Sequence, residues 1–299
     1  MDTIEKQKMK VVSSGKPVGA EILGLDLTRD LDDETLGAIR KALDDYGVIC
    51  IRDPNLTPEQ QVAFTSRFGK TEKHILHKQY GLPGYPEILL IGNVMDNGRY
   101  VGVNDGGLKW HTDLSYKREP TLYSFLYAVE VPVKDGRSLG DTLFASTAHA
   151  YDTLDDAMKK RLASLTGVHS YTKQFNERLE KKKQIGEARE GLSKDQLASV
   201  PDITHPVIRT HPVTGRKCVY VNEWFTIGIE GMPAKEGAAL VQELHAHTTR
   251  EEVVYRHKWR VGDLLIWDNP QTVHLATFDF TPDQRRLMRR TIIEGSQPF

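Results

Sequence analysis

The chain has 299 residues, of which 39% are hydrophobic and 27% are charged, so it can bury a sizeable core beneath a solvated surface. Its formal net charge of −1 gives no support to a role on nucleic acid or on a membrane surface. The first residues lack the apolar run of a secretory signal, no stretch approaches the ~20 apolar residues that a membrane helix needs, and two cysteines make no disulfide framework. We therefore expect a cytoplasmic protein without nucleic-acid or membrane partners.

The first predicted elements are two helices around a short strand. Apolar residues recur at helical spacing over residues 32–46, and Gly47 follows as a typical C-terminal stop. Residues 48–51 are apolar and predict a buried strand. A second helix is predicted to begin after Thr57, which can cap it, and to end near residues 68–69. These elements indicate that the N-terminal part of the chain combines helices with a strand.

From about residue 88 the composition favours strands. Strands are predicted at residues 88–91, 122–131, 218–221, 262–267 and 288–293, and helices at 145–165 and 234–249. No internal repeat, low-complexity tail or Pro/Gly linker divides the chain, so residues 1–299 are predicted to form a single domain. Because strands carry the later motifs while helices cluster near the start and in insertions, we expect a mainly β fold with flanking helices, a β-sandwich or jelly roll.

Two segments are predicted to lie outside the regular framework. Residues 93–109 are rich in glycine and asparagine, which is typical of a loop. Residues 177–190 are dense in lysine and glutamate, and a solvated face or flexible excursion is favoured there over a binding role. A lid over an active site is the alternative for this charged segment.

The middle and the end of the chain carry residue types that bind iron. His111 and Asp113 are two residues apart, so an extended segment directs both side chains to the same side. His274 lies just past a predicted strand and turn, where a ligand of a preformed site is well placed. Two histidines and one carboxylate can occupy one face of an octahedral Fe(II) ion and leave three positions open. For each histidine taken alone, the alternative to a metal ligand is an ordinary surface or interior histidine whose hydrogen bonds are made within the protein or with water.

Four arginines fall within residues 285–290. Strand alternation predicts that Arg286 and Arg290 share one face, and that the other two share the opposite face. Two arginines facing a β-sandwich interior are costly unless each meets an anion. At ~3.3 Å per residue they would be ~13 Å apart, which favours two separate anionic groups. A solvated edge strand is the alternative.

Seven short motifs follow one another along the chain: Trp110-His111-Thr112-Asp113, Gly140-Asp141-Thr142-Leu143, Arg209-Thr210-His211-Pro212, Val221-Asn222-Glu223, Trp267-Asp268-Asn269, His274 and Gln284-Arg285-Arg286. In order and approximate spacing they resemble the taurine dioxygenase and 2,4-dichlorophenoxyacetate dioxygenase family of Fe(II)/2-oxoglutarate enzymes. The resemblance covers most of the chain, from about Gly19 to the C-terminus, and the joint pattern is highly specific.

This resemblance implies a double-stranded β-helix in which His111, Asp113 and His274 hold Fe(II). 2-Oxoglutarate would chelate the iron, and its far carboxylate would pair with Arg286, helped by the hydroxyl of Thr142. Molecular oxygen is the further co-substrate that the resemblance implies. The keto acid would be converted to succinate and CO2 while the substrate is hydroxylated.

The resemblance also suggests a substrate pocket. Arg290 matches the arginine that binds a substrate's sulfonate or carboxylate in this family. The other pocket residues that it suggests are His77, Tyr80, Asn104, Tyr116, Phe175 and Phe225. Core packing is the alternative for the aromatic residues, and a surface loop is the alternative for the first two. Arg285 is the alternative keto-acid ligand, because the interval after His274 is one residue longer than in taurine dioxygenase.

We therefore predict a dioxygenase that hydroxylates a small organic anion, namely an alkylsulfonate such as taurine, an alkyl sulfate or an aryloxyalkanoate. Oxidation next to the heteroatom would release sulfite, sulfate or a phenol. The runner-up is a non-catalytic jelly-roll binding or sensing protein, which would produce no succinate. A halogenase is disfavoured, because that chemistry usually needs a metal site without a carboxylate and Asp113 is present. The resemblance further suggests a homo-oligomer, either a dimer or a tetramer.

Overall fold

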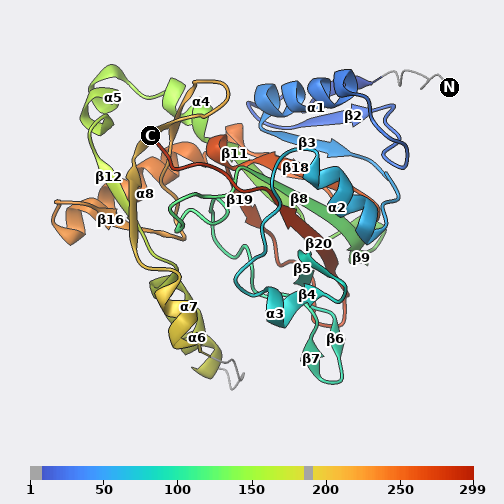
Figure 1. Cartoon of the computed structure of the whole chain (residues 1–299). Helices are drawn as coiled ribbons and strands as arrows, with labels where there is room; N and C mark the ends of the chain where they lie inside the picture. Colours follow the sequence, from blue (N-terminus) through green and yellow to red (C-terminus); the bar gives the residue numbers. More distant parts are fainter. Residues whose placement is uncertain (1–8, 185–190) are drawn as a thin grey trace.

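The computed structural model of the chain describes residues 9–184 and 191–299. Its largest sheet has eight strands in the spatial order β1-β2-β3-β18-β8-β20-β5-β4 (Figure 1). Their bounds are Lys10–Ser13 (β1), Ala20–Leu23 (β2), Val48–Ile51 (β3), Leu264–Asp268 (β18), Tyr123–Glu130 (β8), Leu287–Ile292 (β20), Tyr85–Gly92 (β5) and Gly81–Leu82 (β4). Strands β2 and β3 run parallel, whereas the other neighbouring strands run antiparallel.

Two three-stranded sheets and three short hairpins complete the strands. The sheets are β17-β11-β19 (Tyr255–His257, Thr142–Ser146, Thr272–Ala276) and β13-β12-β16 (Ile203–Pro206, Thr166–His169, Thr226–Ile229). The hairpins are β6-β7 (Met95–Asp96, Arg99–Tyr100), β9-β10 (Val133–Lys134, Arg137–Ser138) and β14-β15 (Ile208–Thr210, Lys217–Val219).

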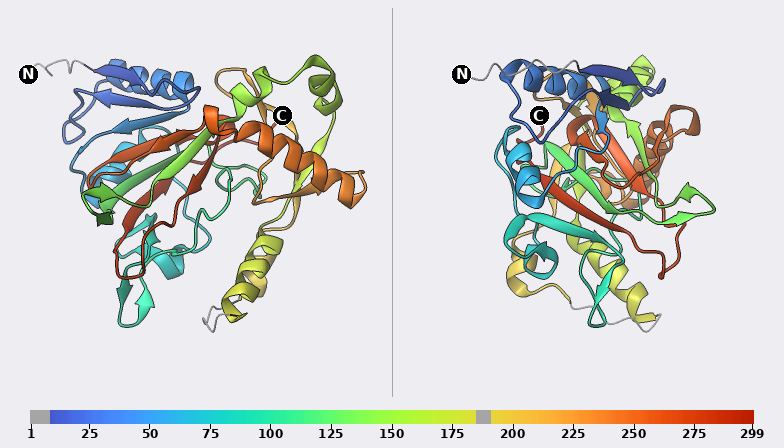
Figure 2. Two further views of the ribbon diagram at one scale, coloured as in Figure 1. Left: turned by 180° about the vertical axis from the view of Figure 1, so that it is seen from behind. Right: turned by 90° about the vertical axis from the view of Figure 1, so that its right-hand side faces the viewer.

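The helices lie at the two sides of this framework. They are α1 (Asp33–Tyr46), α2 (Pro58–Ser66), α3 (His77–Tyr80), α4 (Thr147–Asp152), α5 (Asp156–Leu162), α6 (Tyr171–Gln184), α7 (Lys194–Ala198), α8 (Ala234–Thr248), and the 3-10 turns η1 (Glu251–Val253) and η2 (Asn269–Gln271). Figure 2 shows α1 and α2, in blue, beside the large sheet, with α8, in orange, on the other side of the molecule. No helix of the described residues is long and apolar enough to cross a membrane.

The two faces of the large sheet bury different partners. Side chains alternate along β18, so Ile266 packs on one face with residues of α1 and α2. Trp267 packs on the opposite face with Phe144 of β11. The same alternation holds on β20, where Met288 joins the β11 side. The fold is thus mainly β with flanking helices, a jelly roll in which the small β17-β11-β19 sheet faces the large one.

The predictions for the first elements are confirmed. Helix α1 begins after Asp32, whose carboxylate accepts the Thr35 N–H, and ends at Gly47 with a positive φ of 67°. Helix α2 begins with a capping box between Thr57 and Gln60. Local side-chain chemistry was therefore enough to place these helix ends.

The single helix predicted over residues 145–165 is in fact two helices, α4 and α5, and begins too early. Its first two residues end strand β11, which pairs with both β17 and β19. Ser146 then caps α4, and Asp155 caps α5 after a break. Serine and aspartate side chains compete with the helix for backbone N–H groups, so each starts a new helix rather than continuing one. That residues 1–299 form a single domain stays a prediction.

Candidate active site

The two predicted histidine ligands are joined through their backbones. The N–H of His111 donates to the carbonyl of His274 at 3.0 Å, and the N–H of His274 donates to the carbonyl of His111 at 2.8 Å. The centroids of the two imidazole rings are 4.1 Å apart. His274 itself belongs to β19 and pairs with Phe144 of β11. Main-chain pairing therefore sets the distance between two residues that lie far apart in the sequence.

Asp113 is buried beside these rings. Its Oδ1 accepts a hydrogen bond from Nη1 of Arg290 at 2.9 Å, and its Oδ2 accepts one from the Ser124 hydroxyl at 2.6 Å. The same Oδ1 lies 3.8 Å from Nε2 of His111. Burial alone would raise the pKa of Asp113, but the Arg290 charge, the two histidines and the Ser124 hydrogen bond hold this pKa well below its usual range. The carboxylate is therefore ionised and suited to bind a cation.

Both imidazoles are neutral near pH 7, because burial lowers the pKa of His111 and lowers that of His274 strongly. Nδ1 of His111 lies 2.8 Å from the carbonyl of Lys109, and donating its proton there leaves Nε2 with a free lone pair. His274 is packed between Phe144 and Trp267, with ring centroids 5.7 Å and 4.8 Å away. Neutral imidazoles and an ionised carboxylate are the forms that bind a divalent metal.

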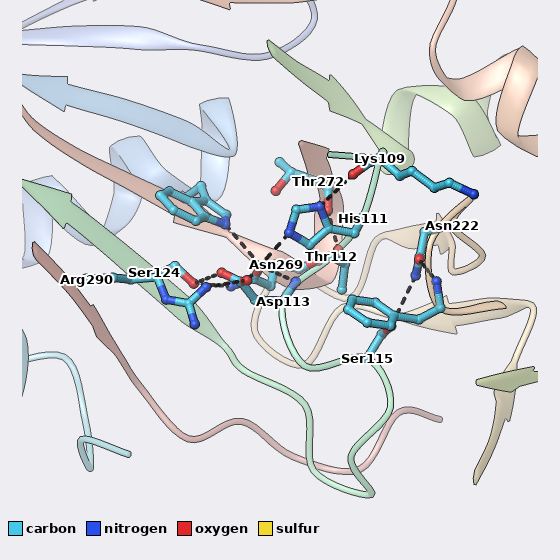
Figure 3. Close-up of polar contacts among 12 residues, drawn as sticks. Lys109, His111, Thr112, Asp113, Ser115, Ser124, Asn222, Asn269, Thr272 and Arg290 are labelled. Atoms are coloured by element: carbon cyan, nitrogen blue, oxygen red, sulfur yellow. Dashed lines mark hydrogen bonds and ion pairs between the residues drawn. The ribbon is translucent and has the colours of Figure 1, made fainter. Parts of the chain in front are cut away.

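Asn269, at the end of β18, links the acidic residue to the sheet (Figure 3). Its side-chain oxygen accepts hydrogen bonds from the Asp113 N–H and from the indole of Trp267, both at 3.1 Å. Its amide nitrogen donates to the Ser124 oxygen at 2.9 Å. Ser124 must then turn its own proton toward Asp113, as observed. One amide therefore orients both the backbone and the carboxylate of Asp113.

Two further motif residues hold neighbouring segments together rather than entering the site. The side-chain oxygen of Asn222 accepts the Phe225 N–H at 2.8 Å, and its amide donates to the Ser115 hydroxyl at 3.1 Å (Figure 3). Nε2 of His211 lies 2.7 Å from Oδ2 of Asp268, and both side chains are fully buried. These contacts fix the chain at Ser115, just after Asp113, and at Asp268, the last residue of β18.

A second group of metal-binding residue types, Cys50, His257 and Asp263, is also buried and closely spaced. It is less suited to a cation. Oδ2 of Asp263 already accepts hydrogen bonds from the Arg260 N–H at 2.8 Å and from the Arg52 guanidinium. Burial also raises the pKa of the Cys50 thiol far above its ordinary value. Among the described residues, only the group of His111, Asp113 and His274 also lines the candidate cavity.

That cavity has a volume of about 110 Å³. Because a single water needs roughly 10–15 Å³, the space can hold many ligand atoms. Its apolar wall includes Leu76, Leu89, Ile91, Val103, Leu114, Leu126, Tyr116, Tyr171, Trp224, Phe225 and Trp267. Its charged and polar lining consists of Asp113, Arg178, Arg286, Arg290, His74, His111, His274 and Thr142.

Arg286 provides a cationic end to the cavity. Its side chain is buried, and its Nε meets no hydrogen-bond partner among the residues described. Burial lowers its pKa to about 10, partly offset by Asp279, so the guanidinium remains charged at neutral pH. A buried cation without a paired anion is costly. This end of the cavity therefore fits the carboxylate of a bound acid, with the hydroxyl of Thr142 in the same lining.

The predicted substrate residues divide into two groups. Arg290, Tyr116 and Phe225 line the cavity. The other four, His77, Tyr80, Asn104 and Phe175, lie outside its lining. His77 and Tyr80 bound α3, and Nδ1 of His77 turns back to the carbonyl of His74 at 2.8 Å, whereas Phe175 packs in a cluster with Tyr171 and Leu179. A substrate role for these four residues stays a prediction from the sequence.

Sequence reasoning also missed His74, Trp224 and Arg178. Arg178 lies in α6, inside the charged segment that was expected to be solvated, whose residues 185–190 are outside the described part of the chain. Its guanidinium lies 5.2 Å from the ring centroid of Trp224 and pairs with Asp105 at 3.3 Å. Arg178 therefore lines the cavity, whereas Glu177, Glu180 and Lys181 of the same segment are exposed, as the composition predicts. Arg285, the alternative keto-acid ligand, instead pairs with Glu130 on the surface.

Comparison with known proteins places the chain in a family. Residues 10–292 match the model of the taurine catabolism dioxygenase TauD, TfdA family. The chain is 34% identical to pentalenolactone F synthase of Streptomyces arenae over 93% of this chain and 92% of that protein. It is 32% identical to the alpha-ketoglutarate-dependent 2,4-dichlorophenoxyacetate dioxygenase of Cupriavidus pinatubonensis over 93% and 95%. A solved taurine dioxygenase from Burkholderia xenovorans superposes with a TM-score of 0.78 at 32% identity, covering 97% of this chain and 92% of that one.

The chain therefore belongs to the TauD, TfdA family. It is an Fe(II)/2-oxoglutarate-dependent dioxygenase that uses molecular oxygen and acts on a small organic substrate. The sequence predictions of family, fold, enzyme class and cofactors are confirmed. The non-catalytic alternative is set aside, because the named relatives are enzymes.

The first testable consequence concerns metal binding. Anaerobic titration of the apoprotein with Fe(II) should show one ion bound per chain. His111→Ala removes a neutral nitrogen ligand from the buried cluster and should weaken binding by at least about 100-fold, since even the loss of an outer partner costs 10–100-fold. His149→Ala, on α4 and outside the cavity lining, should bind iron normally. Unchanged iron binding by the His111 variant would refute the assignment.

Proposed function

We propose that His111, Asp113 and His274 hold the Fe(II) ion, and that Arg286 and Thr142 bind the far carboxylate of 2-oxoglutarate. The observation that carries this proposal is the buried guanidinium of Arg286, whose Nε has no hydrogen-bond partner among the described residues and which lines the same cavity as His111, Asp113 and His274. A dicarboxylic keto acid can bridge these two ends, because one carboxylate can meet the metal and the other the arginine.

Within this site the protein's side chains bind the iron and the keto acid, orient the ligand atoms and shield the metal site from water. The bound iron and keto acid supply the activation of oxygen that protein side chains cannot perform. The charge of Arg290 keeps Asp113 ionised, and Ser124 and Asn269 hold its carboxylate in one orientation. The rings of Trp224 and Phe225 lie 4.7 Å and 6.0 Å from that of His111, so they cover one side of the metal site with apolar surface.

The charges of the site favour a substrate with one negative charge. Iron brings two positive charges and 2-oxoglutarate brings two negative ones, while Asp113 offsets one of the two arginines, Arg286 and Arg290. Arg178 is paired with Asp105, and burial lowers the pKa of His74 to about 3, so neither adds net charge. One positive charge remains. Arg290 uses Nη1 to pair with Asp113, and its other N–H groups are the donors that we assign to a substrate anion. We therefore place the substrate anion at Arg290.

The lining also indicates what the rest of the substrate is like. Most of the wall is aliphatic or aromatic, and Asp113 is the only carboxylate among the described residues that line the cavity. An ammonium group such as that of taurine would therefore lose its hydration without gaining an anionic partner. An apolar body carries no such cost and gains from burial. Of the predicted classes, we favour aryloxyalkanoates, alkyl sulfates and unsubstituted alkylsulfonates over taurine.

A substrate screen tests this choice. Succinate release would be measured with Fe(II), 2-oxoglutarate and oxygen for taurine, butanesulfonate, hexyl sulfate and 2,4-dichlorophenoxyacetate. Taurine and butanesulfonate form a matched pair, because both are sulfonates and only taurine carries an ammonium group. We expect the apolar-bodied anions to exceed taurine in kcat/KM. Preferential turnover of taurine would contradict the proposal about the substrate body but not the reaction class.

The two inward arginines should have separable roles. Removing one partner of a buried charge pair costs roughly 3–5 kcal/mol, or about two to three orders of magnitude in affinity. Arg286→Ala should weaken 2-oxoglutarate binding by that much, measured anaerobically from the metal-to-ligand absorption band with no primary substrate present. Arg290→Ala should leave this affinity nearly intact and raise the share of uncoupled succinate formation. Arg285→Ala, on the surface, is the matched control.

If the Arg290 variant lost 2-oxoglutarate as severely as the Arg286 variant, the assignment of two anions to two arginines would be wrong.

A glycine pair offers a second test of the keto-acid end. Gly136 and Gly140 both have a φ of +74°, so alanine strains both equally. A Cβ at Gly140 would lie 2.9 Å from Nε of Arg286, whereas one at Gly136 would meet nothing within 4 Å. Gly140→Ala should therefore weaken 2-oxoglutarate binding about tenfold or more, a loss of about 1.4 kcal/mol. Gly136→Ala should retain wild-type affinity, and equal losses in both variants would count against the role of Arg286.

The cytoplasmic location and the assembly into a dimer or tetramer stay predictions from the sequence. Size-exclusion chromatography with light scattering would measure the assembly directly.

A further inference from the structure

Trp259 is a buried residue next to the keto-acid end that the proposed function does not yet use. Its side chain is 1% exposed and lies just after β17. Its indole N–H donates a hydrogen bond to the Thr142 hydroxyl oxygen at 3.0 Å. A buried indole N–H requires a hydrogen-bond acceptor, and this requirement is structural, because many acceptors can meet it. Here the acceptor is the hydroxyl of Thr142, a residue that lines the candidate cavity, so the bond also affects the cavity.

A threonine hydroxyl has one proton and two lone pairs. Trp259 occupies one lone pair of Thr142, and the described residues provide no acceptor for the hydroxyl proton. Thr142 is 3% exposed and lines the candidate cavity. With the indole N–H on one lone pair, the proton and the second lone pair of the hydroxyl remain, and an acceptor in the cavity selects the orientation in which the hydroxyl donates. A carboxylate oxygen is such an acceptor, and hydrogen bonds to ionised groups are the strong ones.

The cationic end of the cavity lies close to this hydroxyl. Gly140 packs directly against the side chain of Arg286, so closely that a Cβ there would lie 2.9 Å from Nε. Thr142 follows two residues later, about 6–7 Å along an extended chain. The arginine and the threonine can therefore contact the same carboxylate.

The indole packs against a residue that does not line the cavity. Its ring packs edge-on against His257, with centroids 4.5 Å apart and an interplanar angle of 85°. His257 lies between the Tyr255 hydroxyl, 3.1 Å from Nδ1, and Asp263, 3.5 Å from Nε2. His257 also pairs with Thr142 in the β11–β17 register. Thr142 thus lies on β11, and Trp259 follows the end of the paired strand β17, which keeps the donor close to its acceptor.

We propose that Trp259 is a positioning residue for 2-oxoglutarate, which turns the Thr142 hydroxyl proton toward the carboxylate held by Arg286. This inference rests on the proposed binding of the keto acid by Arg286 and Thr142. Trp259 does not touch the keto acid, and it acts only through the oxygen of Thr142.

A double-mutant cycle measures this action. The readout is the affinity of Fe(II)-loaded protein for 2-oxoglutarate under anaerobic conditions, without turnover. Trp259→Phe keeps an aromatic ring but removes the N–H, and should weaken binding about fivefold, the effect of one neutral hydrogen bond. Thr142→Val removes the hydroxyl and should weaken binding about 10-fold to 100-fold, the effect of a hydrogen bond to a charged group. In the Thr142→Val background, Trp259→Phe should cause no further loss.

Thr142→Ser supplies the conservative control. It retains the hydroxyl, so Trp259→Phe should again weaken binding about fivefold in this background. A purely structural role for Trp259 predicts the same loss in all three backgrounds, and that result would overturn the inference. An unchanged affinity of Trp259→Phe beside intact Thr142 would overturn it as well.

A measurement on the wild-type residue covers the case in which Trp259→Phe does not fold. With nitrogen-15-labelled tryptophan and Zn(II) in place of iron, the Trp259 indole N–H resonance should shift when 2-oxoglutarate binds. Trp224 and Trp267 line the cavity, so their resonances can respond as well, and only the Trp259 response should depend on the Thr142 hydroxyl. The Trp259 resonance should lose its response in Thr142→Val, which also identifies it. The absence of any such resonance would refute the inference. Normal 2-oxoglutarate binding by Arg286→Ala would instead refute the proposed function itself, so the two failures are distinguishable.

Discussion

The reciprocal backbone bridge between His111 and His274 is the constraint on which the site depends. It joins the extended segment after the 93–109 loop to strand β19, and thereby places two imidazoles with centroids 4.1 Å apart. Because β19 also pairs with β11, the same set of hydrogen bonds brings Thr142 to the cavity. His111, His274 and Thr142 are therefore positioned by one set of backbone hydrogen bonds rather than by independent loops, which favours a preformed site.

Three arginines near the end of the chain show how alternation distributes buried charge. Arg289 points to the helix-covered face of the large sheet, where its guanidinium donates to the Leu56 carbonyl at 2.5 Å and lies 4.4 Å from the Tyr127 ring centroid. Arg290 points to the opposite face and pairs with Asp113. Arg286 precedes β20, beyond a register irregularity between Leu287 and Met288. The Nε atoms of Arg286 and Arg289 both lack a hydrogen-bond partner among the described residues. Arg289 nevertheless has a carbonyl acceptor and an aromatic ring within the protein, whereas Arg286 lines the cavity.

Some of this arrangement could be predicted from sequence because its causes are local. The i and i+2 spacing places His111 and Asp113 on one side of an extended segment, and the capping residues fix both ends of α1 and the start of α2. The extent of β11 could not be predicted, because the hydrogen bonds that make it a strand come from β17 and β19. The resemblance to the family, rather than periodicity, connected His274 and Arg286 to the first two ligands.

The difference between the two ends of the cavity explains why the reaction class was predictable and the substrate was not. The iron and keto-acid end is built largely on paired strands, whose spacing follows from alternation. The substrate end is built from segments outside the large sheet, with His74 before α3, Val103 in the 93–109 loop and Arg178 on α6. The ion pair between Arg178 and Asp105 joins two of these segments, which composition assigned to a solvated face or flexible excursion and to a loop, respectively. Side chains in such segments are positioned by one another and not by a repeating backbone, so sequence spacing carries little information about what they will bind.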